Sequence, residues 1–292
     1  MGYTAIRRLR QFVALFPIAW RMIPIVFESP PMNLGLQDKV ILVSGGAKGI
    51  GEGVARVLAA EGAIPVVIGR NVGDNEAVVR SIQSSGGRAF GVQVELSQTD
   101  DCRHAVEATI AKFGRIDGLV NNAGVNDGVN LEHGDTERFL ASLRKNLIHY
   151  YELAHFALPE LKKSRGAIVN IGSKVAETGQ GGTSAYAAAN GGRNALTREW
   201  AVELAKYDIR VNAVIVAECW TPMYASWLST VPNAEETRRK IESRIPLGHR
   251  MTSCEEIANM VAVLLSPRSS HTTGQLIHVD GGYVHLDRAC AP

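Results

Sequence analysis

Residues 39–61, KVILVSGGAKGIGEGVARVLAAE, decide the fold, because they pass from an apolar run through a glycine-rich turn into a helical pattern. The run Val40–Val43 is typical of a strand that is buried on both faces of a parallel sheet. Apolar residues then recur at helical spacing, so a helix is predicted over 50–61. The chain is therefore expected to form a strand, a turn and a helix here.

Three of the glycines in the turn, Gly45, Gly49 and Gly51, leave its main chain open. Backbone N–H groups and the positive end of the helix that starts at Ile50 can then approach a pyrophosphate. Lys48 is followed by glycine and not by Ser or Thr, so the turn is not a P-loop. The sequence predicts a dinucleotide site; a tight turn without a ligand is the alternative.

Strand-like and helix-like segments alternate along the rest of the chain. Strands are predicted at 40–44, 64–69, 89–94, 117–121, 167–172, 210–216 and 275–279, and helices near 50–61, 74–85, 99–113, 136–163, 183–206 and 255–265. Strict alternation implies an α/β fold, a single Rossmann-like, doubly wound parallel sheet with helices on both faces. The region 218–253, which contains three prolines, interrupts the alternation and is expected to form a lid over the ligand crevice.

One domain with a Rossmann-like fold, residues 32–292, is predicted after an N-terminal extension, residues 1–31. In the extension, arginines precede an apolar run, which is the order of a signal or anchor. The run is shorter than the ~20 residues of a spanning helix and contains Arg21 and two prolines. A loosely ordered extension, or a segment upstream of the true start, is preferred over attachment to a membrane surface.

Composition excludes several classes of function. With 292 residues, 46% of them hydrophobic, the chain can bury a full α/β core, and its net charge of +2 gives no electrostatic reason to expect nucleic acid as a partner. The four cysteines are widely spaced and show no metal-ligand spacing. We therefore expect no metal, and a reducing compartment, the cytoplasm.

The end of the second predicted strand bears on the choice of cofactor. Arg70 lies where NAD-selective sites usually place an acidic residue, and Lys48 adds a second positive charge nearby. A 2′-phosphate favours such cations, so NADP is preferred over NAD; the alternative is that both are solvated surface charges. Glu95 ends the third strand, where it would meet the adenine amino group, and Asn122-Ala123-Gly124 follow the fourth strand beside the adenine ribose.

Three polar residues fall beyond strand ends, where catalytic groups of such sheets gather. Asn146 lies in a helix, Ser173 ends a strand, and Tyr186 opens the long helix that follows. A phenol there would exchange a proton with a substrate hydroxyl while hydride passes to or from a nicotinamide, and Ser173 would hold the reacting oxygen. Taken singly, each of the three is more often structural, and their joint occurrence favours catalysis.

Over 36–285 the chain resembles the short-chain dehydrogenase/reductase family. The resemblance rests on Gly45-x-x-x-Gly49-Ile50-Gly51, Asn121-Asn122-Ala123-Gly124, Asn146, Ser173, Tyr186, Arg210-Val211-Asn212-Ala213, Thr221-Pro222 and Asp280-Gly281-Gly282. It implies that Ser173 and Tyr186 act on the substrate oxygen, that Asn146 holds a water of a proton relay and that Thr221 meets the nicotinamide carboxamide. It also implies a homo-tetramer or a homodimer.

Within that family, several stretches are similar to bacterial L-fucose (aldose 1-) dehydrogenases. They are NLIHYY (146–151), TGQG (178–181), LTREWAV (196–202), SHTTG (270–274) and DGGYVHLDRA (280–289). This similarity implies a sugar substrate whose anomeric hydroxyl is oxidised to a lactone. The candidates for pairing with its hydroxyls are Glu177, Gln180, Glu218, Trp220 and His149; ordinary loop polarity is the alternative for each.

The chain departs from the family pattern Tyr-x-x-x-Lys, because Asn190 follows Tyr186 at the lysine position. Asn190 can bind a nicotinamide ribose hydroxyl, but it carries no charge to favour the phenolate. This departure, with Val216-Ala217 in place of Pro-Gly, predicts slow turnover, and Asn190→Lys is then expected to raise the rate on the order of a hundredfold. A catalytically weak nucleotide-binding relative and a carbonyl or 3-oxoacyl reductase are the alternative functions.

Overall fold

The structure, a computed structural model, describes residues 33–286. Chain contacts divide the protein into two units, Met1–Asn33 and Leu34–Pro292. The predicted extension, residues 1–31, lies outside the described residues. None of the helices within residues 33–286 has the combined length and apolar character needed to cross a membrane.

Seven parallel strands form one sheet in the order β3-β2-β1-β4-β5-β6-β7. They are β1 (Val40–Ser44), β2 (Ile64–Gly69), β3 (Phe90–Gln93), β4 (Gly118–Asn121), β5 (Ala167–Ser173), β6 (Arg210–Val216) and β7 (Leu276–Val279). The chain winds outward from β1 to β3 and then returns to β4 on the other side of β1. The strand order thus reverses between β1 and β4, and the crevice beyond the carboxyl ends of the strands is the expected ligand site at such a point. The predicted Rossmann-like fold is confirmed.

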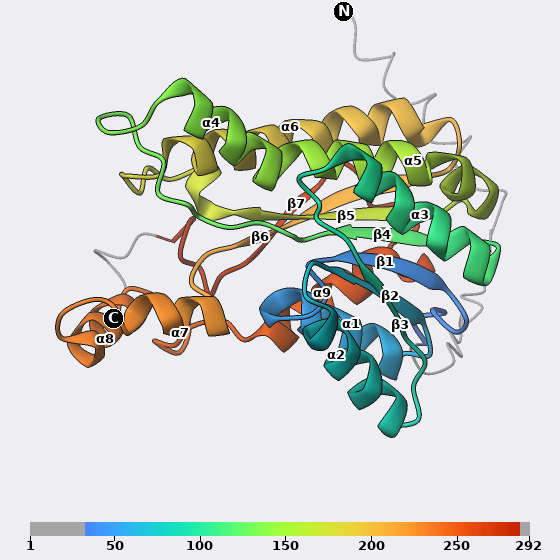
Figure 1. Cartoon of the computed structure of the whole chain (residues 1–292). Coiled ribbons are helices and arrows are strands. Elements are labelled where there is room, and N and C mark those ends of the chain that lie inside the picture. The colour runs from blue at the N-terminus through green and yellow to red at the C-terminus, as the bar shows by residue number, and fades with distance from the viewer. Residues whose placement is uncertain (1–32, 287–292) are drawn as a thin grey trace, which may run out of the picture. The chain divides into compact units, whose positions relative to one another are not determined.

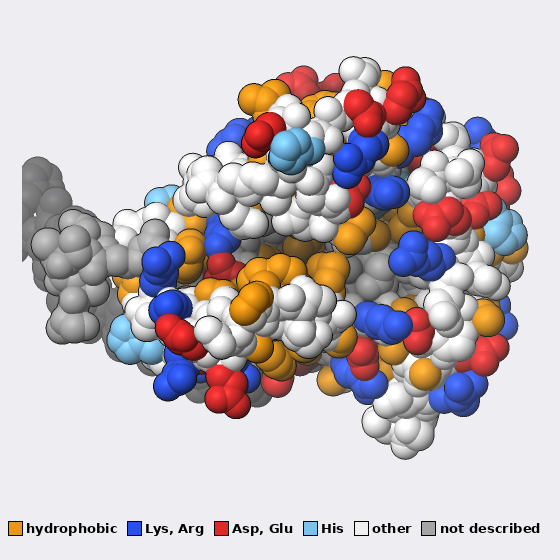
Figure 2. Space-filling model, turned by 60° about the vertical axis from the view of Figure 1, so that its left-hand side comes forward, with side chains coloured by type: hydrophobic (Ala, Val, Ile, Leu, Met, Phe, Trp, Pro, Cys, Tyr) orange, Lys and Arg blue, Asp and Glu red, His pale blue; other side chains and the backbone are white. Residues whose placement is uncertain are grey.

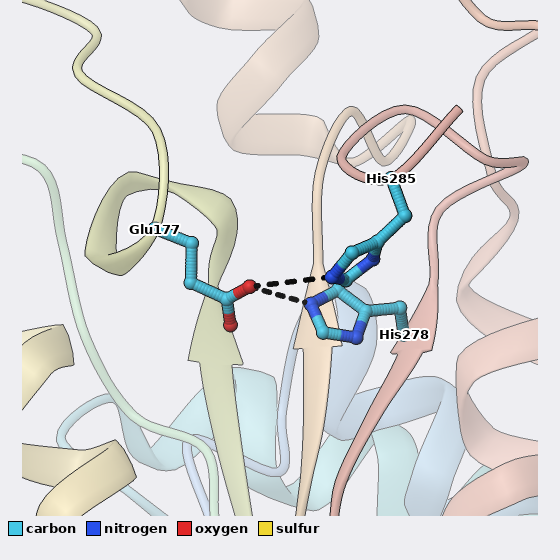
Figure 3. A group of neighbouring side chains, drawn as sticks. All are labelled: Glu177, His278 and His285. Atoms are coloured by element: carbon cyan, nitrogen blue, oxygen red, sulfur yellow. Dashed lines mark hydrogen bonds and ion pairs between the residues drawn. The ribbon is translucent and has the colours of Figure 1, made fainter. Parts of the chain in front are cut away.

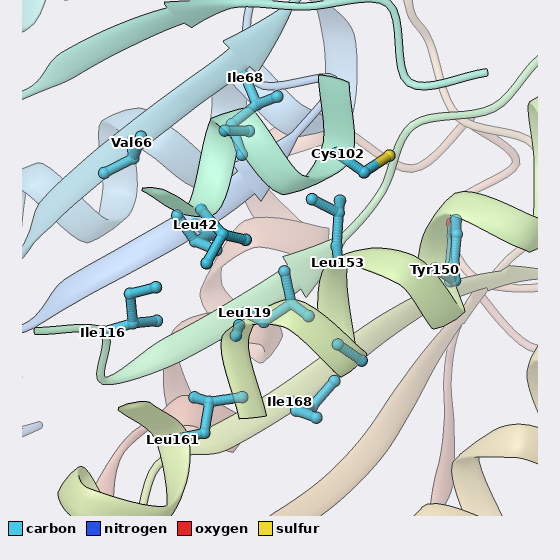
Figure 4. Packing of buried hydrophobic residues seen from close by; sticks show 14 of the residues in the cluster. Leu42, Val66, Ile68, Cys102, Ile116, Leu119, Tyr150, Leu153, Leu161 and Ile168 are labelled. Atoms are coloured by element: carbon cyan, nitrogen blue, oxygen red, sulfur yellow. The ribbon is translucent and has the colours of Figure 1, made fainter. Parts of the chain in front are cut away.

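Helices cover both faces of the sheet (Figure 1). They are α1 (Gly49–Ala60), α2 (Val72–Ser84), α3 (Thr99–Phe113), α4 (Thr136–Leu143), α5 (His149–Ser164), α6 (Ser184–Ala205), α7 (Pro222–Leu228), α8 (Ala234–Glu242) and α9 (Cys254–Leu265). Successive residues of β1 point to opposite faces, as the pleat requires. Leu42 therefore packs with α5 residues such as Leu153 (Figure 4), whereas Ile41 and Val43 pack with α1 and α9.

The prediction of one helix over 136–163 is wrong in one respect. A π-helical turn, Arg144–Ile148, separates α4 from α5 while the chain keeps its helical course. Such turns insert an extra residue, and they are frequent at functional sites. Asn146 lies in this turn.

Two glycines lie inside α6, where glycine weakens a helix. A Cβ at Gly192 would lie 2.8 Å from the side chain of Leu147, so this glycine allows α6 to pack closely on the π-helical turn. A Cβ at Gly191 would meet no atom within 4 Å. Packing therefore explains why position 192 is a glycine but does not explain the glycine at position 191.

The region 218–253 contains α7 and α8, two short helices that the sequence pattern did not predict. The chain enters and leaves this region side by side, because Trp220 N donates to Thr252 O and Thr252 N donates to Glu218 O. The side chains of Met223 and Trp227 on α7 are exposed. The region is therefore an excursion joined to the sheet at both ends, as a lid would be, and lid closure stays a prediction.

Candidate active site

The glycine-rich turn after β1 has a backbone that other residues do not readily adopt. Gly45 and Gly49 have φ angles of +64° and +55°, which place them in the left-handed region. A Cβ at Gly51 would overlap the carbonyl oxygen of Gly45 and would lie 2.6 Å from Nδ2 of Asn122. Lys48, the N-cap of α1, makes no side-chain capping bond, so the N–H groups of the first turn can bind an anion. These residues fit a dinucleotide pyrophosphate.

The turn after β4 is bonded to the end of β1. Ser44 Oγ accepts hydrogen bonds from the backbone N–H groups of Asn122 (2.8 Å) and Ala123 (3.1 Å), and Asn122 Nδ2 donates to Ser44 O (2.9 Å). A Cβ at Gly124 would lie 2.8 Å from Arg193 Nη2. The two turns at the switch point are therefore fixed to one another, and Gly124 is required where the chain passes the arginine.

The residues predicted to select the cofactor differ in their partners. Lys48 Nζ pairs with Asp74 Oδ2 at 2.7 Å. Arg70 is exposed and forms no ion pair with any residue of the described chain. Glu95 is exposed, and its carboxylate accepts hydrogen bonds from N and Oγ of Ser97, both at 3.1 Å. Arg70 is thus the cation of this group whose charge no carboxylate offsets.

Thr221 lies next to Gly49 of the glycine turn. Its Oγ1 caps α7 by accepting from Tyr224 N (3.1 Å), and a Cβ built on Gly49 would be 3.4 Å from Thr221. Ile50 packs into the core that α1 forms with α9. Thr221 is therefore close to the predicted pyrophosphate site, as a contact with bound cofactor requires.

Asn146 is held rigidly by the π-helical turn. Its side chain is fully buried; Oδ1 accepts from Val125 N (2.8 Å) and Nδ2 donates to Ser142 O (3.0 Å). Both ends of the amide are therefore occupied by protein, and the carbonyl oxygen of its backbone is the group left for other donors.

The backbone carbonyl of Asn146 accepts a hydrogen bond from Arg193, a residue that the sequence analysis missed. Arg193, on α6, is 2% exposed and donates from Nε to Asn146 O at 2.7 Å. Its Nη1 donates to Ile171 O on β5 and to Asn190 Oδ1, both at 3.1 Å. Its Nη2 is buried without a hydrogen-bond partner, and it forms no ion pair with any residue in 33–286.

Arg193 is also close to the predicted catalytic phenol. Its Cζ lies 5.9 Å from the centroid of the Tyr186 ring and 4.3 Å from that of Tyr150. Asn190 is fully buried between them and donates from Nδ2 to the carbonyl oxygen of Tyr186 at 2.9 Å. One buried cation thus joins the segments that carry three of the predicted catalytic residues, Asn146, Tyr186 and Asn190.

The sequence contained a weak signal for Arg193. It follows Tyr186 by seven residues and Asn190 by three, so all three lie on one face of a helix. The pattern alone does not distinguish a buried arginine from a solvated one. Ser173 ends β5 two residues after Ile171, and its Oγ accepts from Val175 N at 3.5 Å.

The residues predicted to pair with sugar hydroxyls are distributed unevenly. Glu218 is bonded to Lys174 in a largely buried ion pair and accepts from Tyr224 Oη at 2.9 Å. Burial, with the nearby Glu218, raises the pKa of Tyr224, so its hydroxyl stays a donor. Trp220 is half-exposed and stacks on the guanidinium of Arg238 at 4.3 Å.

The other three candidates have different surroundings. Gln180 is exposed in the loop after β5, and Glu177 in the same loop contacts two histidines. His149 is 1% exposed, and its Nε2 lies 3.0 Å from Lys145 O. Burial, aided by the charge of Arg193, lowers the pKa of His149 to about 3, so it is neutral at pH 7. The structure therefore does not bring His149 to the surface where a substrate binds.

Figure 2 shows one face of the molecule as hollowed, with hydrophobic side chains in the hollow and charged ones around it.

The chain was compared with families and with curated proteins. A family model described as Enoyl-(Acyl carrier protein) reductase matches residues 45–284. The chain is 36% identical to 3-oxoacyl-(acyl-carrier-protein) reductase FabG of Thermotoga maritima, over 85% of this chain and 99% of that protein. It is 34% identical to L-fucose dehydrogenase of Bos taurus, over 86% of this chain and 91% of that protein.

The chain also superposes on solved structures of a dehydrogenase and a ketoreductase. Cj0485 dehydrogenase superposes with a TM-score of 0.85 at 44% identity, covering 89% of this chain and all of that one. A single-residue variant of actinorhodin polyketide ketoreductase with NADPH superposes with a TM-score of 0.81 at 29% identity, covering 85% of this chain and 98% of that one. The fold, the site and these likenesses establish that the chain belongs to the short-chain dehydrogenase/reductase family of oxidoreductases.

Proposed function

We propose that this protein is an active NADP-dependent dehydrogenase that oxidises the anomeric hydroxyl of L-fucose or a related aldose to the lactone. The sugar assignment is supported by the L-fucose dehydrogenase relatives and by the five stretches that resemble such enzymes. The observation that carries the catalytic part is the position of Arg193 beside Tyr186 and Asn190.

Arg193 supplies the positive charge that Asn190 lacks. Its guanidinium carbon lies 5.9 Å from the centroid of the Tyr186 ring, and a nearby positive charge favours a phenolate over a neutral phenol. Arg193 Nε also occupies the Asn146 carbonyl, and Asn146 is the residue to which the family resemblance assigns the relay water. The guanidinium therefore binds the carbonyl to which the relay water would otherwise bind.

A nicotinamide held at this site would supply hydride-transfer chemistry at the anomeric carbon. Tyr186, as the phenolate, takes the proton of the anomeric hydroxyl, and Ser173 donates a hydrogen bond to the same oxygen. We assign Glu218, Gln180 and Trp220 to contacts with the remaining hydroxyls and the sugar face. Arg70 would hold the 2′-phosphate of the cofactor, and the glycine turn and Asn122-Ala123-Gly124 would hold the rest of the dinucleotide.

A reductase of carbonyl or 3-oxoacyl substrates is the second candidate. It is favoured by the description of the matching family model and by the FabG relative. Arg193 disfavours a nucleotide-binding relative without turnover. A buried cation with no counter-ion among the described residues costs stability, and a catalytic role would explain why the chain carries it. We also propose a cytoplasmic enzyme that forms a homo-tetramer or homodimer.

A substrate panel tests this assignment. The purified full-length protein is assayed for reduction of NADP and NAD with L-fucose, its stereoisomers and other aldoses, and for oxidation of NADPH with ketones and 3-oxoacyl thioesters. We expect NADP reduction with L-fucose or a 6-deoxy relative. Turnover limited to the carbonyl substrates would replace the dehydrogenase assignment by the reductase, and cofactor binding without turnover would contradict both.

A further inference from the structure

Glu177 and two histidines that follow it by about a hundred residues converge at the ends of β5 and β7. Glu177 lies in the loop after β5, His278 in β7, and His285 in the turn after β7. Glu177 Oε2 is 3.0 Å from Nε2 of His278 and 4.0 Å from Nε2 of His285. The two imidazole rings meet edge to face, with centroids 4.3 Å apart. Figure 3 shows both rings presenting a nitrogen to the same carboxylate.

This geometry suits a metal ion. The three ligand atoms all lie within 4.8 Å of one another. A tetrahedral zinc with bonds of about 2.0–2.1 Å separates its ligand atoms by about 3.4 Å. The two distances from the carboxylate oxygen, 3.0 and 4.0 Å, lie on either side of this value. Small side-chain rotations would therefore bring the three atoms into the coordination sphere.

The chemistry of the ligands selects the kind of metal. Two imidazoles and one carboxylate suit zinc and its neighbours in the first transition row, whereas magnesium and calcium prefer oxygen ligands throughout. The His285 side chain is 62% exposed, against 16% for His278. The site therefore opens to solvent on the His285 side, which leaves a fourth position for water.

We propose that Glu177, His278 and His285 bind a zinc-like divalent cation, with water as the fourth ligand. The ion ties the loop that follows Ser173 to the turn after β7, two segments that the chain separates by about a hundred residues. Sequence analysis predicted no metal, because the four cysteines show no metal-ligand spacing, and Glu177 lies about a hundred residues from the two histidines. This proposal does not depend on the proposed substrate.

Metal binding by the full-length, tag-free protein tests the site. After removal of bound metal, zinc is titrated by calorimetry, and cobalt is added to follow the visible absorption of a tetrahedral complex. We expect one ion per chain with a micromolar or lower Kd, and at least a tenfold weaker Kd in both Glu177→Gln and His285→Gln. Both altered side chains are partly exposed, so these variants are expected to fold.

Two variants serve as matched controls. His271→Gln removes an exposed imidazole elsewhere, and Cys254→Ser removes one of two thiols whose sulfur atoms lie 3.9 Å apart, a competing pair of zinc ligands. Both should bind zinc as the unaltered protein does. The proposal fails if no ion binds below millimolar zinc, if Glu177→Gln and His285→Gln bind normally, or if binding is lost in Cys254→Ser.

Discussion

Two buried charges lie at opposite ends of the sheet and differ in how they are compensated. Asp117, just before β4, is 8% exposed and accepts from Val40 N (3.0 Å), Lys39 Nζ (3.1 Å) and Arg115 Nε (2.8 Å). Arg193, toward the carboxyl end, is also buried but has no carboxylate partner within the described chain and leaves Nη2 unbonded.

The difference in charge compensation suggests a structural role for Asp117 and a functional role for Arg193. Burial raises the pKa of Asp117, but hydrogen bonds from Arg115, Val40 and Lys39 outweigh it, so the net pKa lies below its ordinary value. Its charge is therefore stabilising. A buried guanidinium without a counter-ion is costly for stability, which fits a role in stabilising a charge that appears during the reaction.

Arg193→Met gives the largest expected effect. Turnover should fall on the order of a hundredfold, because the buried cation beside the Tyr186 ring is lost, and the pH profile of turnover should move to higher pH. The free energy of unfolding should change by less than about 1 kcal/mol, since loss of the unpaired charge offsets the lost hydrogen bonds. Steady-state pH profiles and cofactor binding measure this, with Arg193→Lys as the charge-retaining control. A uniform fall in rate without movement of the pH profile would indicate a merely structural role.

Asp117→Asn should have the opposite signature. We expect a loss of about 2 kcal/mol in the free energy of unfolding at pH 7, because Arg115 and Lys39 lose their counter-ion while remaining partly solvated. Turnover of the folded variant should stay within about twofold of the unaltered protein. Urea denaturation and turnover assays check this. A fall in turnover as large as in Arg193→Met would contradict the assignment of a structural role to Asp117 and a functional role to Arg193.

The pH dependence of stability sharpens the same comparison. Because the pKa of Asp117 is lowered by folding, its contribution is complete above its ordinary value of about 3.9 and is lost as the pH falls through the lower folded value. The difference in unfolding free energy between the unaltered protein and Asp117→Asn should therefore be constant from about pH 5 to 8 and shrink below about pH 4. A constant difference down to about pH 2 would refute this assignment.

A lysine at position 190 tests whether Arg193 replaces the family lysine. The sequence alone predicts about a hundredfold gain for Asn190→Lys, but Asn190 Oδ1 is 3.1 Å from Arg193 Nη1, where a second cation would be repelled. We therefore expect no gain in the single variant and about a tenfold recovery when Asn190→Lys is added to Arg193→Met. A hundredfold gain in Asn190→Lys alone would show that Arg193 does not supply the charge.

Arg70→Ala should have the smallest effect. Arg70 is exposed and unpaired within the described chain, so its contact with a 2′-phosphate is screened by water. We expect kcat/KM for NADP relative to NAD to fall about fivefold to tenfold. Lys48→Ala should change the ratio less, since Lys48 already pairs with Asp74. The reverse order of the two variants would assign the phosphate to Lys48.

Local patterns predicted most of the fold. The strands 40–44, 64–69 and 210–216 have the bounds that the sequence predicted, because an apolar run between turn signals reports burial directly. The π-helical turn at 144–148 was missed because one extra residue hardly alters a helical pattern. Asn146, Ser173 and Tyr186 were predicted to be catalytic from motifs, whereas Arg193 was not, because motifs record residue types and not burial.

The sequence by itself therefore determined the alternation of strands and helices, the open glycine turn and the family, since each depends on residues close together in the chain. Tertiary structure alone decided which side chains meet: Arg193 with Asn146 and Tyr186, and Glu177 with His278 and His285. The physical reason is that the order of strands brings distant loops to one edge of the sheet, and no spacing in the sequence encodes how deeply a side chain is buried there.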